Sequence, residues 1–513
     1  MTQTMMGTDY AGVECIKITR DAWDPVNTPD ADRWKFLYNS KWSKDVRVQA
    51  VRVGWLGLPK GFNTVESNWD VLSSGPRSGE VYPAFELIKS NLFGMGKGLA
   101  YQLPLFQSLE TDANGWYVGR RSVRSFLGTQ EDTQVDAVRE GTYGVEDIIY
   151  ASGTEFRISV GPAAESGSYF TFAANQSMAY AFPNRKLMVW NLPGDDAPVQ
   201  NGQPLAPVPG QQQILIGPNF LRVAKTGHNA ATATGTQLAL DTSQVPAKVL
   251  AARDVLVPSG LSAVPIGYPV PPNCVIDCHF YKDGDPIYYP SGPYGEIIGA
   301  YYRLNGNVVE FNNPGGALRA RFIVLASDNT PATAGANNVL RQFSENGQDV
   351  VQFLRPGSGN PPSFADIALD SRWPAMQILR EDYLPVPDGY NVSQTVNFDA
   401  AGMFPFVKFV TVHGAGVMEG LRAATTPKMI RLPRVTMWNR TGGTSGGWPG
   451  GKIMGGDSCF CQYNTNSVTF WTSRGSPKYQ ARYTRQGGAA EIRSTYDEIP
   501  IAGIRYYVFG IAI

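Results

Sequence analysis

Hydrophobic and polar positions alternate along this chain in many short segments, with the two-residue period of β-strands. Residues 301–304 and 308–311 are two such segments on either side of Asn305-Gly306, a dipeptide that is typical of tight hairpin turns. Residues 318–325, after Gly315-Gly316, predict the next strand along the chain. Long stretches with helical period are nearly absent, so the pattern predicts an all-β fold.

The final segment, residues 504–513, is strand-like and apolar almost throughout. An exposed apolar strand pairs readily with other chains, because the N–H and C=O groups along its edge have no partner. We therefore expect this segment to be a central strand of a sheet or to be covered by a neighbouring subunit.

A longer pattern occurs three times. Each copy has a basic and apolar start, a polar turn region rich in Gly, Pro and Asn, an aliphatic–Asx–Ser/Thr step, and an apolar strand that ends at a proline. The copies start at residues 16–20, 221–227 and 353–357, reach the step at Asn39-Ser40, Asp241-Thr242 and Asp370-Ser371, and end at Pro59, Pro258 and Pro387. The first and third copies also share a Ser–basic–Trp sequence. Repetition of this kind identifies the folding unit.

The repeat and the loop composition predict three tandem β-sandwich-like modules with long Gly/Pro-rich loops. Module one covers residues 1–190 with insertions, and residues 191–212 form a Pro/Gly-rich crossover. Module two covers residues 213–335, and module three covers residues 336–513. The copies are spaced too irregularly for a solenoid, so they fit tandem domains that have diverged.

The composition agrees with β-strands joined by many turns, since the chain has 55 Gly, 37 Pro, 24 Phe, 11 Trp and 24 Tyr. Its 44 basic residues balance 44 acidic ones, and nucleic-acid binding normally needs a concentrated basic face. The first residues lack the features of a signal peptide, and no run of about 18 apolar residues occurs. We therefore expect synthesis in a cytoplasm, with no nucleic acid and no membrane as partner.

The glycine-rich segment 441–456 partly matches two catalytic patterns. Residues 446–452 approach a phosphate-binding loop, but Ile453 stands where a magnesium-binding hydroxyl is needed. Residues 443–447 match the nucleophile-elbow pattern, which requires a strand–turn–helix that this chain does not predict. We interpret the segment as a flexible loop, in which Trp448 is a candidate contact residue.

The five cysteines can form at most two internal disulfide bonds, which leaves one thiol unpaired. Cys274, Cys278, Cys459 and Cys461 are the candidates for disulfide bonds. The favoured interpretation is that they are small buried hydrophobes, and disulfide bonds are the alternative. A zinc site is disfavoured, because Cys274 and Cys278 would lie about 13 Å apart along one strand. We expect no metal and no cofactor. The histidines and paired carboxylates predict no catalytic constellation.

The repeated segment resembles a module that recurs in virion proteins of tailed bacteriophages. The resemblance rests on residues 221–230 with 238–242, and on Arg355-Pro356-Gly357 with Leu369-Asp370-Ser371. The first copy departs most, with Thr19-Arg20-Asp21 in place of the turn. The resemblance implies a particle component of the neck or collar, the tail or the capsid surface, and it has no catalytic residues to carry over.

These observations together favour a non-enzymatic structural protein of a phage virion, made in the host cytoplasm. It is expected to form homo-oligomers and to contact other virion proteins, with Trp448, Ile511 and Ile513 as candidate interface residues. The alternative is a tail-fibre or receptor-binding protein that recognises host-surface glycan. A third possibility is a glycosidase, which would need two acids about 5–10 Å apart in a groove.

Overall fold

The structure is a computed structural model, and it describes 26 stretches of the chain. They are residues 2–44, 46–53, 70–74, 84–90, 101, 103–111, 115–118, 123–128, 135–136, 146–152, 155–161, 184–199, 205–244, 247–266, 270–271, 274–290, 300–326, 339–387, 392–414, 428–433, 435–440, 451–454, 459–472, 482–486, 489–493 and 501–513. Over these residues the fold is all-β, as predicted, with helical turns of three residues only.

Three small sheets each consist of a hairpin, a short 3-10 turn and a third strand. The first has β1 (Gln3–Thr8), β2 (Glu14–Thr19), η1 (Arg33–Lys35) and β3 (Phe36–Asn39). The second has β14 (Ile214–Gly217), β15 (Phe220–Ala224), η4 (Gly235–Gln237) and β16 (Leu238–Asp241). The third has β24 (Leu340–Glu345), β25 (Gln348–Leu354), η5 (Phe364–Asp366) and β26 (Ile367–Asp370). These sheets contain the start and the aliphatic–Asx–Ser/Thr step of each sequence copy, while the apolar strand that closes each copy lies in another sheet.

Two long antiparallel sheets form the middle of the molecule. One has the order β27 (Gln377–Pro385), β37 (Ile501–Ile511), β29 (Phe404–Gly414), β30 (Lys428–Arg431), β11 (Glu146–Ser152), β12 (Glu155–Gly161), β6 (Ala84–Ser90) and β5 (Asp70–Ser74). The other has the order β18 (Gly260–Pro265), β22 (Val308–Asn313), β21 (Tyr301–Asn305), β8 (Tyr117–Val118), β7 (Pro104–Thr111), β13 (Asn184–Pro193) and β4 (Val48–Val53).

Four smaller sheets complete the described strands. They are β17 (Lys248–Val257), β23 (Leu318–Ala326) and β19 (Cys274–Tyr281); β20 (Ile287–Tyr289), β33 (Cys459–Tyr463), β34 (Ser467–Thr472) and β28 (Val392–Asn397); β10 (Val135–Asp136), β9 (Val123–Gly128), β31 (Val435–Arg440) and β32 (Gly451–Met454); and β35 (Arg482–Gln486) with β36 (Ala489–Arg493). Among the described strands, β9 and β31 are the parallel pair.

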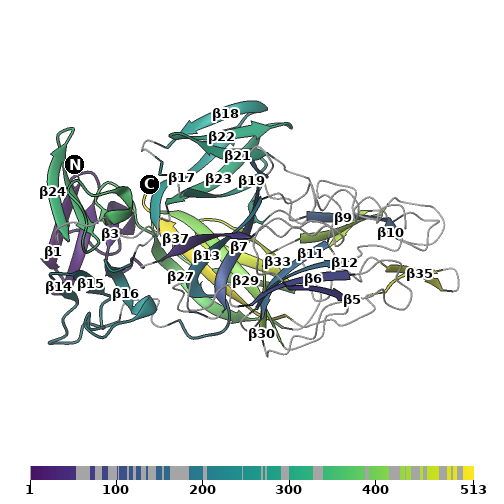
Figure 1. Cartoon of the computed structure of the whole chain (residues 1–513), viewed down its shortest axis with the longest axis horizontal. Coiled ribbons are helices and arrows are strands. Elements are labelled where there is room, and N and C mark those ends of the chain that lie inside the picture. The colour runs from purple at the N-terminus through teal and green to yellow at the C-terminus, as the bar shows by residue number, and fades with distance from the viewer. Residues whose placement is uncertain are drawn as a thin grey trace.

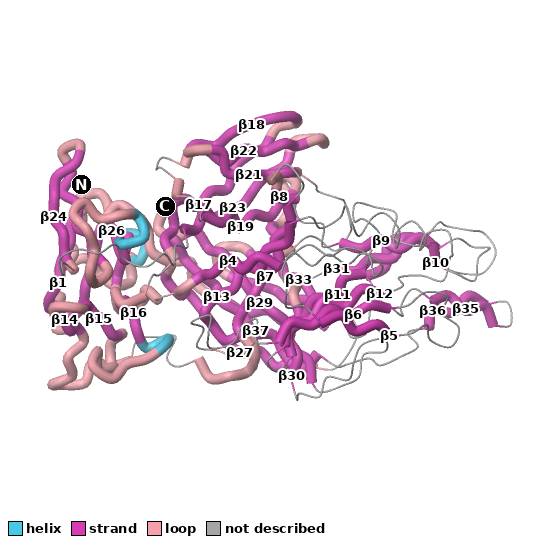
Figure 2. The backbone as a smooth tube through the Cα atoms, in the orientation of Figure 1, coloured by secondary structure: helices cyan, strands magenta, loops and turns pink. Residues whose placement is uncertain are grey.

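The three small sheets lie together at one end of the molecule, at the left of Figure 1 and Figure 2. The two long sheets combine strands from different predicted modules: one joins module one to module three, and the other joins module one to module two. Trp190 of β13 stacks on Phe509 of β37 within the largest apolar core, with ring centroids 5.4 Å apart. The segments 1–190, 213–335 and 336–513 are therefore not separate domains, because they share sheets and a core.

The C-terminal strand β37 is central, which was one of the two expectations for it. It lies between β27 and β29, so both of its edges are hydrogen-bonded within the chain. From Gly503 to Ala512 every residue is buried. Strong apolar character here is thus explained by burial on both faces of the sheet.

The predicted hairpin at Asn305-Gly306 is present, but its turn is displaced by one residue. Asn305 pairs with Val308, so the two-residue turn consists of Gly306 and Asn307. Gly306 takes a φ of +56°, which suits a residue without a Cβ atom. Strand β23 follows, as the sequence predicts.

Candidate functional site

The three small sheets share one backbone plan. In each, the second and third strands pair with a bulge at the same place: between Ile18 and Thr19, between Val223 and Ala224, and between Phe353 and Leu354. The 3-10 turn precedes the third strand in every copy. When the copies are aligned at the bulge, Ile16, Leu221 and Val351 occupy equivalent positions, two residues before Ile18, Val223 and Phe353.

The aliphatic–Asx–Ser/Thr step has a structural role that explains its repetition. The hydroxyls of Ser40, Thr242 and Ser371 accept hydrogen bonds from the backbone N–H groups of Ile16, Leu221 and Val351, at 3.0, 2.8 and 3.0 Å. The preceding Asn39, Asp241 and Asp370 side chains each accept the N–H group two residues further along, at 3.1, 3.0 and 2.9 Å. The step therefore ends the third strand with an Asx turn and ties it to the second strand.

The three copies bury equivalent residues in one common core. Four equivalent positions contribute to it, each from copies one, two and three in turn: Ile16, Leu221 and Val351; Ile18, Val223 and Phe353; Tyr38, Leu240 and Leu369; Leu37, Ala239 and Ala368. Leu37 is only partly buried. A core built from the same positions of each copy places the sheets around a pseudo-threefold axis. We call this unit the repeat ring.

Contacts between copies run in one direction around the repeat ring. Lys248, six residues after Thr242 in copy two, donates through Nζ to the carbonyl of Phe364 in the 3-10 turn of copy three, at 2.7 Å. Gln377 has the equivalent position in copy three, and its Nε2 lies 3.4 Å from the carbonyl of Arg33 in the turn of copy one. Head-to-tail contacts of this kind close a ring. The third junction, from copy one to copy two, differs.

At that third junction lies a pocket of about 200 Å³. In copy one the Arg33 guanidinium stacks on Trp42, 4.2 Å from the ring centroid, and in copy three Phe364 packs on Trp373, with centroids 5.2 Å apart. The equivalent pair in copy two is Gly235 and Gln244, and both line the pocket. The full lining is Arg47, Asn191, Leu192, Arg222, Thr234, Gly235, Thr236, Leu238, Asp241 and Gln244.

Charged side chains in the pocket are held in fixed positions. Arg222 donates to the carbonyls of Ala231 and Ala233, at 3.3 and 2.5 Å, and its Nε lies 3.4 Å from Asp241. Arg47 donates to Oε1 of Gln244 at 2.8 Å. Since guanidinium groups stay protonated in proteins, the lining carries two positive charges and one negative charge.

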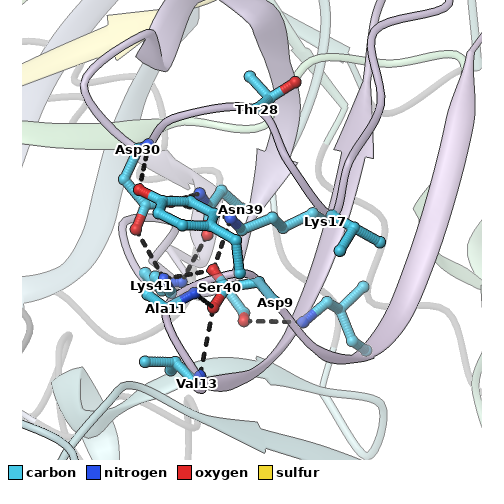
Figure 3. Close-up of polar contacts among 12 residues, drawn as sticks. Asp9, Ala11, Val13, Lys17, Thr28, Asp30, Asn39, Ser40 and Lys41 are labelled. Carbon is cyan, nitrogen blue, oxygen red and sulfur yellow. Dashed lines mark hydrogen bonds and ion pairs between the residues drawn. The ribbon is translucent and has the colours of Figure 1, made fainter.

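In copy one the same place holds a buried ion cluster, drawn in Figure 3. Lys17 lies 2.7 Å from Asp9 and 3.0 Å from Asp30, while Lys41 lies 2.5 and 2.6 Å from the same carboxylates. Asn39 carries no charge, so these two aspartates balance the two lysines. Burial alone would raise the pKa of Asp9, but hydrogen bonds from Lys17 and Lys41 lower it below its usual value.

A second group of charges lies where the repeat ring meets the long sheets. Lys44 and Glu381 form an ion pair in which both side chains are buried. Burial lowers the pKa of Lys225 to about 7, with a further contribution from the positive charge of Lys44. Burial also lowers the pKa of Arg33 to about 10. The junction therefore concentrates positive charge away from water.

A third polar group lies within the core of the long sheets. Asp277 pairs with Lys408, and the Nε2 atom of His279 lies 3.1 Å from the hydroxyl of Tyr463. Tyr463 accepts from Arg321 at 3.0 Å. Burial holds the pKa of His279 well below its usual value, so this imidazole stays neutral. The group cross-links buried strands and is enclosed by apolar residues.

The predicted interface residues have different positions. Ile511 is fully buried between β27 and β29, so it is not available to a neighbouring copy, and this prediction was wrong. Ile513 is 49% exposed, and its carbonyl accepts from Arg20 at 2.5 Å. Trp448 lies outside the described residues.

No disulfide bond joins Cys15 or the four candidate cysteines, so the disulfide alternative was wrong. Cys274 and Cys278 lie four residues apart on the continuous strand β19, which keeps their sulfur atoms apart. Cys278, Cys459 and Cys461 are buried and serve as small core residues.

Across the described stretches no cluster of three or more metal-ligating side chains occurs. In the same part of the chain no helix is long and apolar enough to span a membrane.

The pocket was missed at the sequence level, although part of its signal was visible. The first and third copies share a Ser–basic–Trp sequence, and the second has Thr242-Ser243-Gln244 there. Gly235, Arg33 and Phe364 lie at equal distance before the Asx of their steps, but only the structure shows that each faces the residue two positions after the step's hydroxyl residue. The fold defines an all-β protein with an internal threefold repeat. No family model, no curated protein and no solved structure matches this chain.

Proposed function

We propose that this chain is a structural component of a tailed-bacteriophage virion, which assembles by self-association and by contacts with other virion proteins. The observation that carries the proposal is the repeat ring: three segments that resemble a phage virion module pack around one core. With its apolar faces turned inward, the ring offers three related outer surfaces. Repeated surfaces suit the symmetric, repeated partners of a particle.

The outer strands of the ring support contacts with neighbouring chains. β1, β14 and β24 are edge strands of their sheets. Each has a large apolar side chain in partial contact with solvent: Met6 is 41% exposed, Ile216 is 53% exposed and Leu340 is 38% exposed. Exposed apolar edges are usually covered in the working assembly, because they otherwise pair with other chains.

Gold-labelled antibody against this protein, applied to purified particles, tests the proposal. Regular label at the neck, tail or capsid surface is expected. A variant with Met6, Ile216 and Leu340 all changed to Asp should be depleted from particles, while Leu261→Asp, at a 75% exposed position on β18, should be incorporated normally. Protein found in the lysate but never on intact particles would refute the proposal.

The alternative, recognition of host-surface glycan by a fibre or receptor-binding protein, is favoured by one observation. The pocket between copies one and two is lined mainly by amide, hydroxyl and charged side chains, which are groups that hydrogen-bond sugar hydroxyls. Label confined to fibre tips, together with binding of the purified chain to host-surface glycan, would favour this function over a structural one.

A further inference from the structure

A lysine and an aspartate from two different sheets contact each other in the core of the long sheets. Asp277 lies on β19, in the three-stranded sheet with β17 and β23, and Lys408 lies on β29, in the eight-stranded sheet. The Nζ atom of Lys408 contacts Oδ2 of Asp277, and the two side chains are 2% and 0% exposed. A nucleophilic amine and a carboxyl group are therefore held together away from solvent.

A third side chain holds both groups in place. Gln107 is buried and lies on β7, in the seven-stranded sheet. Its Nε2 atom donates to Oδ1 of Asp277 at 3.0 Å, and its Oε1 atom accepts from Nζ of Lys408 at 2.7 Å. One amide therefore orients the amine and also places a donor on the carboxyl oxygen, as an oxyanion-hole donor does in acyl transfer.

The surroundings of this pair disfavour charge. Oδ2 of Asp277 accepts no hydrogen bond from the residues that the structure describes, so its contact with Lys408 is not an aligned salt bridge. A buried ion pair without full hydrogen bonding costs free energy. Nζ lies 4.3 Å from the ring centroid of Tyr289 and 4.8 Å from that of Phe406. Their attraction for an ammonium is a smaller effect than its loss of hydration.

Two other buried contacts between lysine and carboxylate have a different charge balance. Asp9 contacts two lysines, which keep its carboxylate ionised. The Lys44–Glu381 pair has a further positive charge nearby, from Arg505. Asp277 instead contacts one lysine and one uncharged amide. Transfer of one proton from the lysine to this aspartate leaves an uncharged amine beside an uncharged carboxyl group, which are the forms that can react.

We propose that Lys408 and Asp277 form an intramolecular amide bond, a modification that the folded chain makes on itself. After one proton has moved from Nζ to Oδ2, the amine attacks Cγ of Asp277 while Gln107 donates to Oδ1. The bond between Cγ and Oδ2 then breaks, Oδ2 takes a second proton from the nitrogen, and one water molecule leaves. The atoms balance without a further reactant. The product joins β19 to β29 covalently, and its formation does not depend on the proposed structural function.

Intact mass spectrometry of the purified and denatured full chain tests the proposal. We expect a mass below that of the sequence by one water molecule, and tryptic digestion should release one linked pair of peptides that contain Asp277 and Lys408. Lys408→Met removes the nucleophile and should restore the full mass of its sequence. Gln107→Leu keeps both reacting groups and should slow formation roughly tenfold or more, measured by mass at fixed times after a pulse of synthesis.

Lys44→Met is the matched control, because it removes the lysine of the buried pair with Glu381, and its mass should still be lower by one water molecule. A succinimide at Asp283-Gly284 also loses water, but it hydrolyses in mild base and an amide bond does not. If Lys408→Met fails to fold, the linked peptides of the wild-type chain still decide the question. A full sequence mass for the wild type, a water loss that persists in Lys408→Met, or one that mild base reverses would each overturn the proposal.

Discussion

The centre of the repeat ring and its polar surroundings differ in how far the three copies agree. In the centre, four layers contain the same position from every copy, always with an apolar side chain, and Ile214 of copy two adds to them. Around it, the site beside the Asx residue is Lys17 with two aspartates in copy one, Arg222 with Asp241 in copy two, and Gln352 with Asp370 in copy three. Shared apolar positions fix the fold, and individual properties of the copies arise in the polar surroundings.

This difference has a physical basis. Apolar burial is non-directional, so three equivalent faces stabilise one another with any well-packed aliphatic or aromatic side chains. A buried charge, in contrast, needs a specific partner at hydrogen-bond distance. Copy one meets this requirement with Asp9 and Asp30, which come from outside its third strand. A change of charge in one copy therefore demands local changes in that copy alone.

Truncation in the centre should have the largest effect on stability. Phe353→Ala removes a fully buried ring from the common core, and we expect a loss of about 4 kcal/mol in the free energy of unfolding. Leu261→Ala, on the exposed side of β18, is the control and should change it by less than about 0.5 kcal/mol. Urea unfolding followed by tryptophan fluorescence measures both. A small loss for Phe353→Ala would mean that the three sheets do not depend on a common core.

Removal of one carboxylate from copy one should have the next largest effect. Asp9→Asn leaves two buried lysines with Asp30 alone, and we expect a loss of about 3 kcal/mol at neutral pH. Because the folded-state pKa of Asp9 is lowered, its contribution is present above the unfolded pKa of 3.8 and disappears as the pH falls through the folded value. Wild type and variant should therefore converge in stability at acidic pH.

The control for this change is Asp21→Asn, which affects a solvent-exposed pair with Arg20 and should cost less than about 0.5 kcal/mol. Chemical denaturation at a series of pH values gives both comparisons. Equal losses for Asp9→Asn and Asp21→Asn would show that burial does not strengthen the cluster.

Lys225 offers a change in the opposite direction, since its burial costs stability. With a folded pKa of about 7 against 10.5 when exposed, it binds fewer protons in the folded state between these values. The cost is therefore complete below pH 7 and decreases as the pH rises toward 10.5. We expect Lys225→Met to be about 2 kcal/mol more stable than wild type at pH 7, with the advantage shrinking at higher pH. An advantage that stays constant from pH 6 to pH 10 would contradict this account.

Strand periodicity was sufficient to predict the all-β fold, the strand after the hairpin and a strand over residues 504–513, but it left open whether that strand is central or covered by a neighbouring subunit. It could not predict the repeat ring, because the meeting of three distant sheets depends on packing between segments hundreds of residues apart. Arg33, Gly235 and Phe364 each lie six residues before the Asx of the step, so the sequence aligns them, but it does not show which side chains meet at a junction between copies. For the same reason the pocket and the ion cluster of Asp9, whose members come from separate loops, were not predicted.

The smallest predicted effect tests the equivalence of the copies most directly. Ser40→Ala, Thr242→Val and Ser371→Ala each remove the hydroxyl that accepts from the second strand, and each should cost about 1 kcal/mol. Similar losses are expected because the three acceptors lie at 3.0, 2.8 and 3.0 Å from equivalent N–H groups. Urea unfolding of the three variants under one condition measures them side by side. A loss confined to one copy would mean that the step has the same geometry in all three copies but stabilises the fold in only one of them. The polar surroundings would then influence even the shared positions.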